Sequence, residues 1–216
     1  MAPAFITFEG IDGSGKTTQL RLLASALKNR GFDVITTREP GGTPLGNRLR
    51  AVLLDARERV DPLAELLLYA ADRAQHVRTL LRPALSAGRI VLSDRYTDAT
   101  VAYQGSGRGF PPELIAQVVA LATGGLVPDL TLLIDLPVAE SRRRAHRRVR
   151  SGAMGDRLDA EDEAFHTRVR AAYLAIAAAE PDRVRIIDAT RSIEETHALV
   201  LETVVPFLEQ KQKTGG

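Results

Sequence analysis

The feature that most constrains this chain is a glycine-rich loop at residues 10–17, GIDGSGKT, which separates an apolar segment from a helical one. The loop fits the pattern G-x-x-x-x-G-K-[ST], whose glycines let backbone N–H groups turn inward around phosphates. The preceding segment, AFITFE at 4–9, has the length and β-branched content of a buried strand. A helix that begins near Lys16 adds the positive end of its dipole. This order of elements predicts a binding site for the phosphates of a nucleotide.

Individual loop residues have separate expected roles. Lys16 is expected to reach the β- and γ-phosphates of a nucleoside triphosphate, and the Thr17 hydroxyl to bind Mg²⁺. The other residues expected to contact the nucleotide are Gly10, Ile11, Asp12, Gly13, Ser14, Gly15 and Thr18. A GTP-binding switch would also need an Asn-Lys-x-Asp motif, which the sequence lacks. A small kinase and a nucleotide-gated binding protein therefore remain as interpretations.

The rest of the chain alternates strand and helix signals. Four more short apolar segments predict strands at 33–37, 89–94, 129–135 and 183–189. Helical patterns lie at 16–30, 45–54, 62–87, 112–123, 138–150, 161–179 and 192–210. Such alternation predicts an α/β fold, a three-layer α/β/α sandwich of the P-loop NTPase class around a parallel sheet of about five strands. Ligands of such sheets bind at the carboxyl ends of the strands.

Composition limits the class of protein. Hydrophobic residues make up 44% and charged residues 26%, a mixture typical of a globular protein with a core. There is no cysteine, which excludes disulfides and thiol chemistry. No basic stretch followed by an apolar region opens the chain, and no apolar run reaches the roughly 18 residues of a membrane span. We therefore expect a cytoplasmic protein without a membrane partner, built as one domain over 1–216 with a frayed tail at 211–216.

Five stretches, in order along the chain, resemble the thymidylate kinase family, whose members phosphorylate dTMP. They are FEGIDGSGKTT (8–18), TREPGGTPLG (37–46), LLYAADRAQH (67–76), SDRYTDATVAYQG (93–105) and GDRLD (155–159). The resemblance implies an enzyme that converts dTMP to dTDP with Mg-ATP, for dTTP biosynthesis. It also implies a homodimer, to which the long helical pattern at 62–87 could contribute the interface.

The resemblance assigns several residues to dTMP. Arg38 ends a predicted strand, where its guanidinium can bind the acceptor phosphate, and Pro40 lies in the turn that follows. Tyr69 and Arg73 are four residues apart on a helical pattern and so share a face. The resemblance implies that Tyr69 stacks on the thymine and that Arg73 donates a hydrogen bond to its O4 edge.

A second group follows the predicted strand at 89–94. Asp94 is expected to hold Mg²⁺ through water, and Arg95 to bind the acceptor phosphate close to the transferred group. The resemblance places three further residues near the sugar and base of dTMP: Thr100, Tyr103 and Gln104. Ala99 stands where the family commonly has serine, which removes one hydroxyl.

The arginine-rich segment at 142–157 allows three interpretations: a solvated basic face, a nucleic-acid patch, or a lid over the γ-phosphate. A nucleic-acid patch would need aromatic residues nearby, and none is present. The variable positions of the phosphate loop carry no basic residue, so charge in the transition state must be offset from elsewhere. The resemblance therefore favours the bacterial type with an arginine-bearing lid. The residues expected to act there are Arg144, Arg148 and Arg157.

Two residues of the nucleotide site carry narrower expectations. Arg191 follows IIDAT on a loop that resembles the adenine-contacting turn of the family. Asp12 is unexpected in a loop that holds anions, and the resemblance implies that it faces the deoxyribose of dTMP, where it can accept a hydrogen bond from the 3′-hydroxyl or help to organise Mg²⁺. The alternative for Asp12 is a turn in which its side chain bonds its own backbone.

Two other functions stay open at this point. One is another nucleoside or nucleotide kinase of the P-loop class; of these, a kinase that accepts nucleosides instead of monophosphates would not need Arg38 and Arg95 at an acceptor phosphate. The other is an ATP-dependent regulator that binds nucleic acid through the arginine cluster. Because the resemblance covers most of the chain, we expect ATP and dTMP as partners and no nucleic acid.

Overall fold

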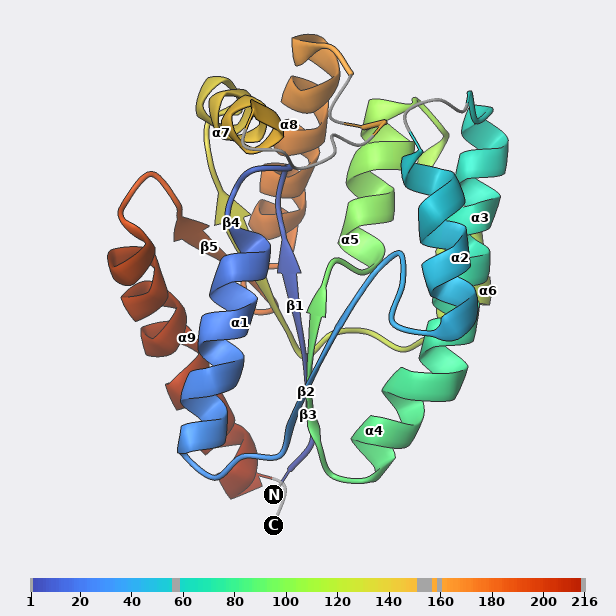
Figure 1. The fold of residues 1–216 in the computed structure, drawn as a ribbon. Helices are drawn as coiled ribbons and strands as arrows, with labels where there is room; N and C mark the ends of the chain where they lie inside the picture. The colour runs from blue at the N-terminus through green and yellow to red at the C-terminus, as the bar shows by residue number, and fades with distance from the viewer. Residues whose placement is uncertain (1, 56–58, 151–156, 159–160, 215–216) are drawn as a thin grey trace.

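The computed structural model describes residues 2–55, 59–150, 157–158 and 161–214. Its centre is a parallel five-stranded sheet in the order β2-β3-β1-β4-β5 (Figure 1). The strands are β1 (Ala4–Glu9), β2 (Val34–Arg38), β3 (Ile90–Asp94), β4 (Leu130–Asp135) and β5 (Val184–Asp188). The predicted fold class is confirmed, and each strand lies within one or two residues of its predicted bounds.

Helices cover both faces of this sheet (Figure 1). The α-helices are α1 (Lys16–Asn29), α2 (Pro44–Leu54), α3 (Pro62–His76), α4 (Arg82–Ser86), α5 (Thr97–Thr100), α6 (Pro112–Thr123), α7 (Val138–Arg150), α8 (Glu163–Ala179) and α9 (Ile193–Thr214). Two π-helical segments complete the described elements, η1 (Val77–Leu81) and η2 (Val101–Gly107).

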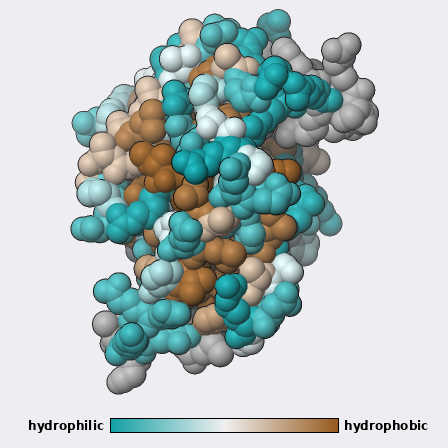
Figure 2. All heavy atoms as spheres, turned by 90° about the vertical axis from the view of Figure 1, so that its left-hand side faces the viewer, coloured by the Kyte–Doolittle hydropathy of each residue, from teal (hydrophilic) through white to brown (hydrophobic). Residues whose placement is uncertain are grey.

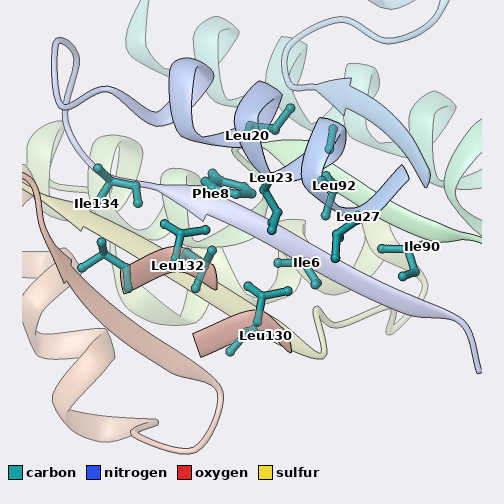
Figure 3. Close-up of a cluster of buried hydrophobic side chains, with 14 of the residues drawn as sticks. Ile6, Phe8, Leu20, Leu23, Leu27, Ile90, Leu92, Leu130, Leu132 and Ile134 are labelled. Atoms are coloured by element: carbon teal, nitrogen blue, oxygen red, sulfur yellow. The ribbon is translucent and has the colours of Figure 1, made fainter. Parts of the chain in front are cut away.

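The core follows from strands that are apolar on both sides, as buried parallel strands usually are. On one face, alternate residues of β1, β3 and β4 pack against α1 and α9. Figure 3 shows Leu20, Leu23 and Leu27 of α1 lying over Ile6 and Phe8 of β1. On the other face, η1 and α4 pack near β3, and α8 and η2 pack beside β4. The space-filling view shows apolar side chains gathered in the middle of a largely hydrophilic face on the α1 and α9 side (Figure 2).

The helical pattern at 62–87 is interrupted in the structure. The chain passes from α3 through the π-helical η1 into α4, which has Pro83 at its start. Proline has no N–H to donate to the preceding turn, so the regular ladder of hydrogen bonds cannot run through this position.

The helical patterns in the sequence leave residues 97–107 without a helix, and this prediction is wrong. The structure has α5 and η2 there. β-Branched residues and glycine give this segment a weak intrinsic preference for a helix, and packing against α8 supplies the stability instead.

The segment expected to be a frayed tail is mostly helical in the structure. α9 continues to Thr214, and Lys211 forms an ion pair with Asp129. Residues 215–216 lie outside the described part of the chain. No helix of the described residues is both long and apolar enough to cross a membrane.

Candidate active site

The phosphate loop joins β1 to α1 and can be formed only with glycine at its first position. Gly10 has a φ of +131°, and a Cβ there would lie 2.4 Å from the carbonyl oxygen of Ile134. The loop ends at α1, which begins with the buried Lys16. Lys16 Nζ donates to the carbonyl oxygens of Gly10 (2.9 Å) and Ile11 (3.0 Å). Burial, and then the nearby Arg95, lower the pKa of this amine.

The first turn of α1 meets the carboxyl end of β3. Thr17 Oγ1 donates a hydrogen bond to Asp94 Oδ2, so a hydroxyl and a carboxylate lie side by side. Both offer the hard oxygen ligands that Mg²⁺ prefers. Within the described residues, no group of three or more His, Cys, Asp or Glu side chains could form a metal cage. Mg²⁺ is commonly bound by one or two protein ligands together with the phosphates of a substrate, and Thr17 and Asp94 fit this kind of site.

Arg95 has an unusual backbone. Its φ is +75°, and it is the only non-glycine residue in the described ranges with a positive φ. Such a conformation costs on the order of 1–3 kcal/mol and persists where the surroundings fix it. Here the Arg95 N–H donates to the carbonyl oxygen of Phe8 (3.0 Å), and its own carbonyl oxygen accepts from Ser93 Oγ (2.8 Å).

The Arg95 guanidinium joins the phosphate loop to η2. Arg95 Nη2 donates to Asp12 Oδ1 (2.7 Å) and to the hydroxyl oxygen of Tyr103 (3.0 Å). The Tyr103 hydroxyl in turn donates to Asp12 Oδ2 (3.0 Å). Burial alone would raise the pKa of Asp12, but the charges of Arg95 and Lys16 outweigh it and hold that pKa well below its usual range. The Asp12 carboxylate is therefore fixed by Arg95 and Tyr103, and not by its own backbone as in the alternative interpretation.

Glu9 and Tyr173, which were not singled out from the sequence, form a hydrogen-bonded pair next to Arg95. Glu9, the last residue of β1, is fully buried and accepts from the Tyr96 N–H (2.7 Å) and the Tyr173 hydroxyl (2.7 Å). Burial, followed by the charge of Asp98, raises the pKa of Glu9 to about 7. Arg95 Nη1 lies 3.3 Å from the Tyr173 hydroxyl. Tyr173 is 164 residues from Glu9, and no local pattern in the sequence links them.

A cavity opens beside this cluster, lined by residues of the phosphate loop, the turn after β2, α3 and η2. It collects all of the predicted dTMP residues except Arg38: Asp12, Pro40, Tyr69, Arg73, Arg95, Thr100, Tyr103 and Gln104. Ala99 also lines it, where the family commonly has serine. We call this the acceptor cavity.

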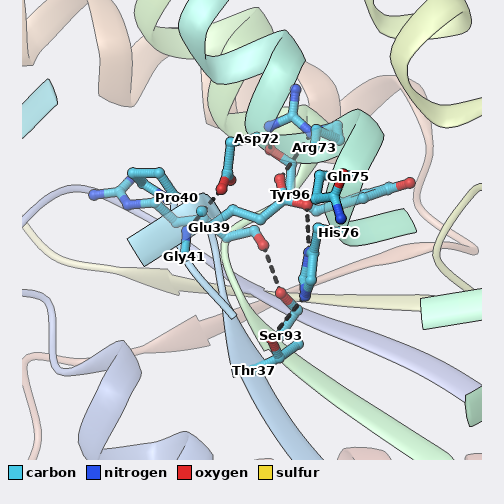
Figure 4. A network of polar contacts seen from close by, with 12 residues as sticks. Thr37, Glu39, Pro40, Gly41, Asp72, Arg73, Gln75, His76, Ser93 and Tyr96 are labelled. Atoms are coloured by element: carbon cyan, nitrogen blue, oxygen red, sulfur yellow. Dashed lines mark hydrogen bonds and ion pairs between the residues drawn. The ribbon is translucent and has the colours of Figure 1, made fainter. Parts of the chain in front are cut away.

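Arg73 is fixed in the wall of the acceptor cavity. Its Nε donates to Glu39 Oε2 (2.7 Å), its Nη1 to Thr100 Oγ1 (2.8 Å) and its Nη2 to the carbonyl oxygen of Tyr96 (2.9 Å). Figure 4 shows this network continuing from Glu39 to His76, whose Nδ1 lies 2.8 Å from Glu39 Oε1. The three donated bonds set the plane of the guanidinium before any ligand binds.

The turn that carries Glu39 is also held from α3. The Glu39–Pro40 peptide bond is cis, and the Gly41 N–H donates to Asp72 Oδ1 (3.1 Å; Figure 4). Burial, and then the charge of Glu39, raise the pKa of Asp72 to about 6.

A second, larger cavity lies on the other side of Asp12 and Arg95, and we call it the donor cavity. It is lined by Lys16 and Thr17 of α1, by Arg38 and Asp94 at neighbouring strand ends, and by Arg144 of α7. Arg38 and Asp94 are directly paired in the sheet register. The residues that line both cavities are Asp12, Glu39, Arg50, Leu54 and Arg95. Arg50 was not expected from the sequence, and its Nη1 donates to the carbonyl oxygen of Pro40.

Other loop and adenine-site residues are placed as follows. Gly13, Gly15 and Thr18 line the donor cavity, whereas Gly10, Ile11 and Ser14 line neither cavity. Ile11 and Ser14 are buried beneath the loop. Arg191 is exposed, pairs with Asp188 (3.3 Å) and lines neither cavity.

The predicted lid is described only in part. Arg144 lines the donor cavity and donates to Glu140 (3.1 Å) and to the carbonyl oxygen of Ala189 (3.0 Å). Arg157 lines neither cavity and pairs with the buried Glu65 (2.6 Å). The side chain of Arg148, residues 151–156 and Asp159 lie outside the described part of the structure.

A family model described as thymidylate kinase matches residues 8–200 of the chain. The chain belongs to the thymidylate kinase family. It is 50% identical over 209 residues to the thymidylate kinase of Geotalea uraniireducens, a match that covers 95% of this chain and 98% of the relative. It is 45% identical to the thymidylate kinase of Exiguobacterium sibiricum, with 99% of each chain covered.

A solved structure supports the same relationship. The crystal structure of thymidylate kinase from Ehrlichia chaffeensis is similar to this fold with a TM-score of 0.76 and 36% sequence identity. The match covers 94% of this chain and 99% of the other. The protein is therefore an enzyme, a thymidylate kinase that phosphorylates dTMP to dTDP.

Proposed function

We propose that this thymidylate kinase transfers the γ-phosphoryl group of Mg-ATP directly to dTMP where the donor and acceptor cavities meet. The observation that carries the proposal is that Asp12 and Arg95 line both cavities. A phosphate placed between them would lie within reach of both substrates. Catalysis in such an arrangement rests on positioning and charge neutralisation, with no covalent intermediate on the protein.

On the donor side, the N–H groups of the loop and the start of α1 hold the ATP phosphates. Lys16 leaves its carbonyl partners in the loop for the β- and γ-phosphates when the nucleotide binds. Thr17 and Asp94 would hold Mg²⁺, which when bound offsets the negative charge on the phosphates. Arg191 is assigned to the adenine end of the nucleotide by the family resemblance alone.

On the acceptor side, the buried ring of Tyr69 is assigned to stacking on the thymine, and Arg73 to its O4 edge. Thr100, Tyr103 and Gln104 surround the sugar and base. Arg38 and Arg95 bind the phosphate of dTMP, and Asp12 accepts a hydrogen bond from the 3′-hydroxyl.

We also assign a lid to residues 142–157 of a single kinase domain. Its arginines are proposed to offset charge that develops on the transferred group, because no basic residue occupies the variable positions of the phosphate loop. Arg144 has the strongest support, since it already lines the donor cavity. Arg148 and Arg157 are assigned to the lid by the resemblance, and Arg157 would have to leave Glu65.

A homodimer in the cytoplasm completes the proposal. Leu63 and Leu67 of α3 are about half exposed, and Leu121 of the adjacent α6 is 79% exposed. Three large apolar side chains on two packed helices form a surface that a second copy of the chain could cover.

The acceptor specificity can be measured by ADP release with each common nucleoside monophosphate in turn. Turnover with dTMP that exceeds turnover with dCMP, AMP and dUMP supports the acceptor-cavity assignment. Equal turnover with dCMP would contradict the roles of Tyr69 and Arg73. Loss of turnover when Mg²⁺ is removed by a chelator, with recovery on adding it back, tests the metal assignment.

A further inference from the structure

We propose that Glu9 and Tyr173 form a positioning pair that holds Arg95 at both ends, at its backbone and at its guanidinium. The proposal rests on the proposed role of Arg95 at the acceptor phosphate. Neither Glu9 nor Tyr173 lines the acceptor or donor cavity, so each would act through Arg95 and not on the substrates.

The backbone contact is made by one oxygen of the Glu9 carboxylate. Glu9 Oε1 accepts from the N–H of Tyr96, the residue directly after Arg95 (2.7 Å). This bond fixes the peptide unit that follows the positive-φ position. Together with the bonds to Phe8 and Ser93, it gives every backbone polar group around Arg95 a partner. The strained positive-φ conformation of Arg95 is therefore stabilised by hydrogen bonds to Phe8 and Glu9 at the end of β1.

The side-chain contact runs through Tyr173, and its direction follows from counting protons. The Tyr173 hydroxyl has one proton, which it donates to Glu9 Oε2 (2.7 Å). Its oxygen can therefore only accept from Arg95, whose Nη1 lies 3.3 Å away. The carboxylate thus orients the hydroxyl lone pairs toward the guanidinium, while Asp12 and Tyr103 hold the other guanidinium nitrogen.

A purely structural role explains the Glu9 carboxylate less well. Burying a carboxyl group disfavours its charged form, and a second carboxylate, Asp98, adds to this cost. The charge of Arg95 offsets part of this cost but does not outweigh it, because the pKa of Glu9 is still raised. An apolar residue would fill the same space without that cost. The cost of burying the Glu9 carboxylate is explained if the two hydrogen bonds that it accepts, from the Tyr96 N–H and the Tyr173 hydroxyl, orient Arg95.

The test is a double-mutant cycle between Tyr173 and Arg95, measured as steady-state kinetics with dTMP and ATP. Tyr173→Phe keeps the ring, which packs in the apolar cluster between α8 and η2, and removes only the hydroxyl. We expect this change to lower kcat about tenfold while the KM for ATP stays within about twofold. In an Arg95→Ala background the same change should alter kcat by less than about twofold, because the group that it positions is gone.

Two further variants sharpen the comparison. Glu9→Gln reverses the bond to Tyr173, because the amide donates where the carboxylate accepted, and should reproduce the loss in kcat. Tyr96→Phe is the matched control: it also removes one buried tyrosine hydroxyl, whose bond goes to the Leu126 carbonyl and not to Arg95. Its kcat should stay within about twofold of the wild type. If Glu9→Gln does not fold, the Tyr173 cycle decides the question.

The outcomes distinguish a failure of the positioning pair from a failure of the proposed role of Arg95. If Arg95→Ala keeps full turnover, the proposed role of Arg95 is wrong. If Arg95→Ala is inactive or slow but Tyr173→Phe behaves as wild type, the positioning pair is wrong and the role of Arg95 stands. Equal losses from Tyr173→Phe with and without Arg95 would also overturn the pair, since they would indicate a general effect on the fold.

Discussion

The carboxylate of Asp12 and the guanidinium of Arg95 lie 2.7 Å apart, at the place where the donor and acceptor cavities meet. The two residues come from different elements, the phosphate loop after β1 and the end of β3. Because β1 and β3 are neighbours in the sheet, their carboxyl ends bring both side chains to the same edge. The acid in the phosphate loop is thus balanced by a cation from the end of a neighbouring strand.

Asp12→Asn should impair the use of dTMP more than the use of ATP. The amide keeps the shape of the side chain but loses the charge that pairs with Arg95 and accepts from Tyr103. Hydrogen bonds to charged groups contribute about 1.5–3 kcal/mol, so kcat/KM for dTMP should fall about 10- to 100-fold. The KM for ATP should change little. Full dTMP activity in this variant would overturn the assignment of Asp12 to the acceptor.

Lys16→Ala should abolish most turnover without unfolding the protein. The side chain is buried, its Nζ contacts two carbonyl oxygens of the loop, and it is the one basic residue among residues 10–17. Removing it should lower kcat by at least about 100-fold. Lys28→Ala is the matched control, because Lys28 is an exposed lysine in the last turn of the same helix. Circular dichroism should show both variants folded; comparable activity in the two would contradict the role of Lys16.

The sheet could be predicted from the sequence for a physical reason, whereas most residues of the acceptor cavity were assigned by the family resemblance. Buried parallel strands are short apolar runs, and the residues at their carboxyl ends, such as Arg38 and Asp94, meet at one edge of the sheet. Tyr69 and Arg73 were assigned to this cavity by the family resemblance, and helical spacing adds that the two share one face.

What the sequence did not predict depends on contacts between distant segments. Glu9 and Tyr173 meet only because α8 packs against η2 beside the end of β1. Arg157 was assigned to the lid from its neighbours in the chain, whereas Glu65 on α3 binds it in this structure. η2 is helical because of its packing and not because of its residues. Pairings of this kind leave no periodic pattern in a single sequence.

The stability of the enzyme should fall as the pH rises from 4.5 to about 7. Burial, and then Asp98, raise the pKa of Glu9 from 4.5 to about 7, so the folded protein retains a proton that the unfolded chain releases in this window. The stabilisation from the protonated Glu9 is complete below pH 4.5 and is lost as the pH rises through about 7. At about 1.4 kcal/mol per pKa unit, the loss from Glu9 reaches roughly 3 kcal/mol. Asp72, whose pKa burial raises from 3.8 to about 6, acts in the same direction.

Thermal unfolding across this pH window can isolate the part due to Glu9. Glu9→Gln removes the titrating group, so Tm should decline less steeply with pH than in the wild type. Glu113→Gln, a change at an exposed position of α6, should leave the wild-type slope unchanged. A Glu9→Gln slope as steep as that of the wild type would show that other groups determine the pH dependence.

Leu67→Glu should separate the proposed dimer into monomers. Leu67 is 54% exposed on α3, and a charge in the centre of an apolar interface would be buried without a partner. Ile186→Glu is the control, since Ile186 is exposed to the same degree (53%) but lies on the edge strand β5. Light scattering coupled to gel filtration should give a monomer mass for the first variant and a dimer mass for the second. A wild-type monomer, or two unaffected variants, would contradict an interface on α3.

Arg144→Ala should lower turnover far more than Arg143→Ala. Both arginines pair with Glu140 on α7, but only Arg144 is among the residues that line the donor cavity. Loss of Arg144 should therefore remove charge stabilisation from the transition state and reduce kcat by about 10- to 100-fold, with the KM for dTMP nearly constant. The two substitutions disturb the same carboxylate and the same helix, so a general effect on α7 would appear equally in both. Equal kinetics would place Arg144 outside the catalytic site, and a rise in the KM for ATP with unchanged kcat would assign it to nucleotide binding instead.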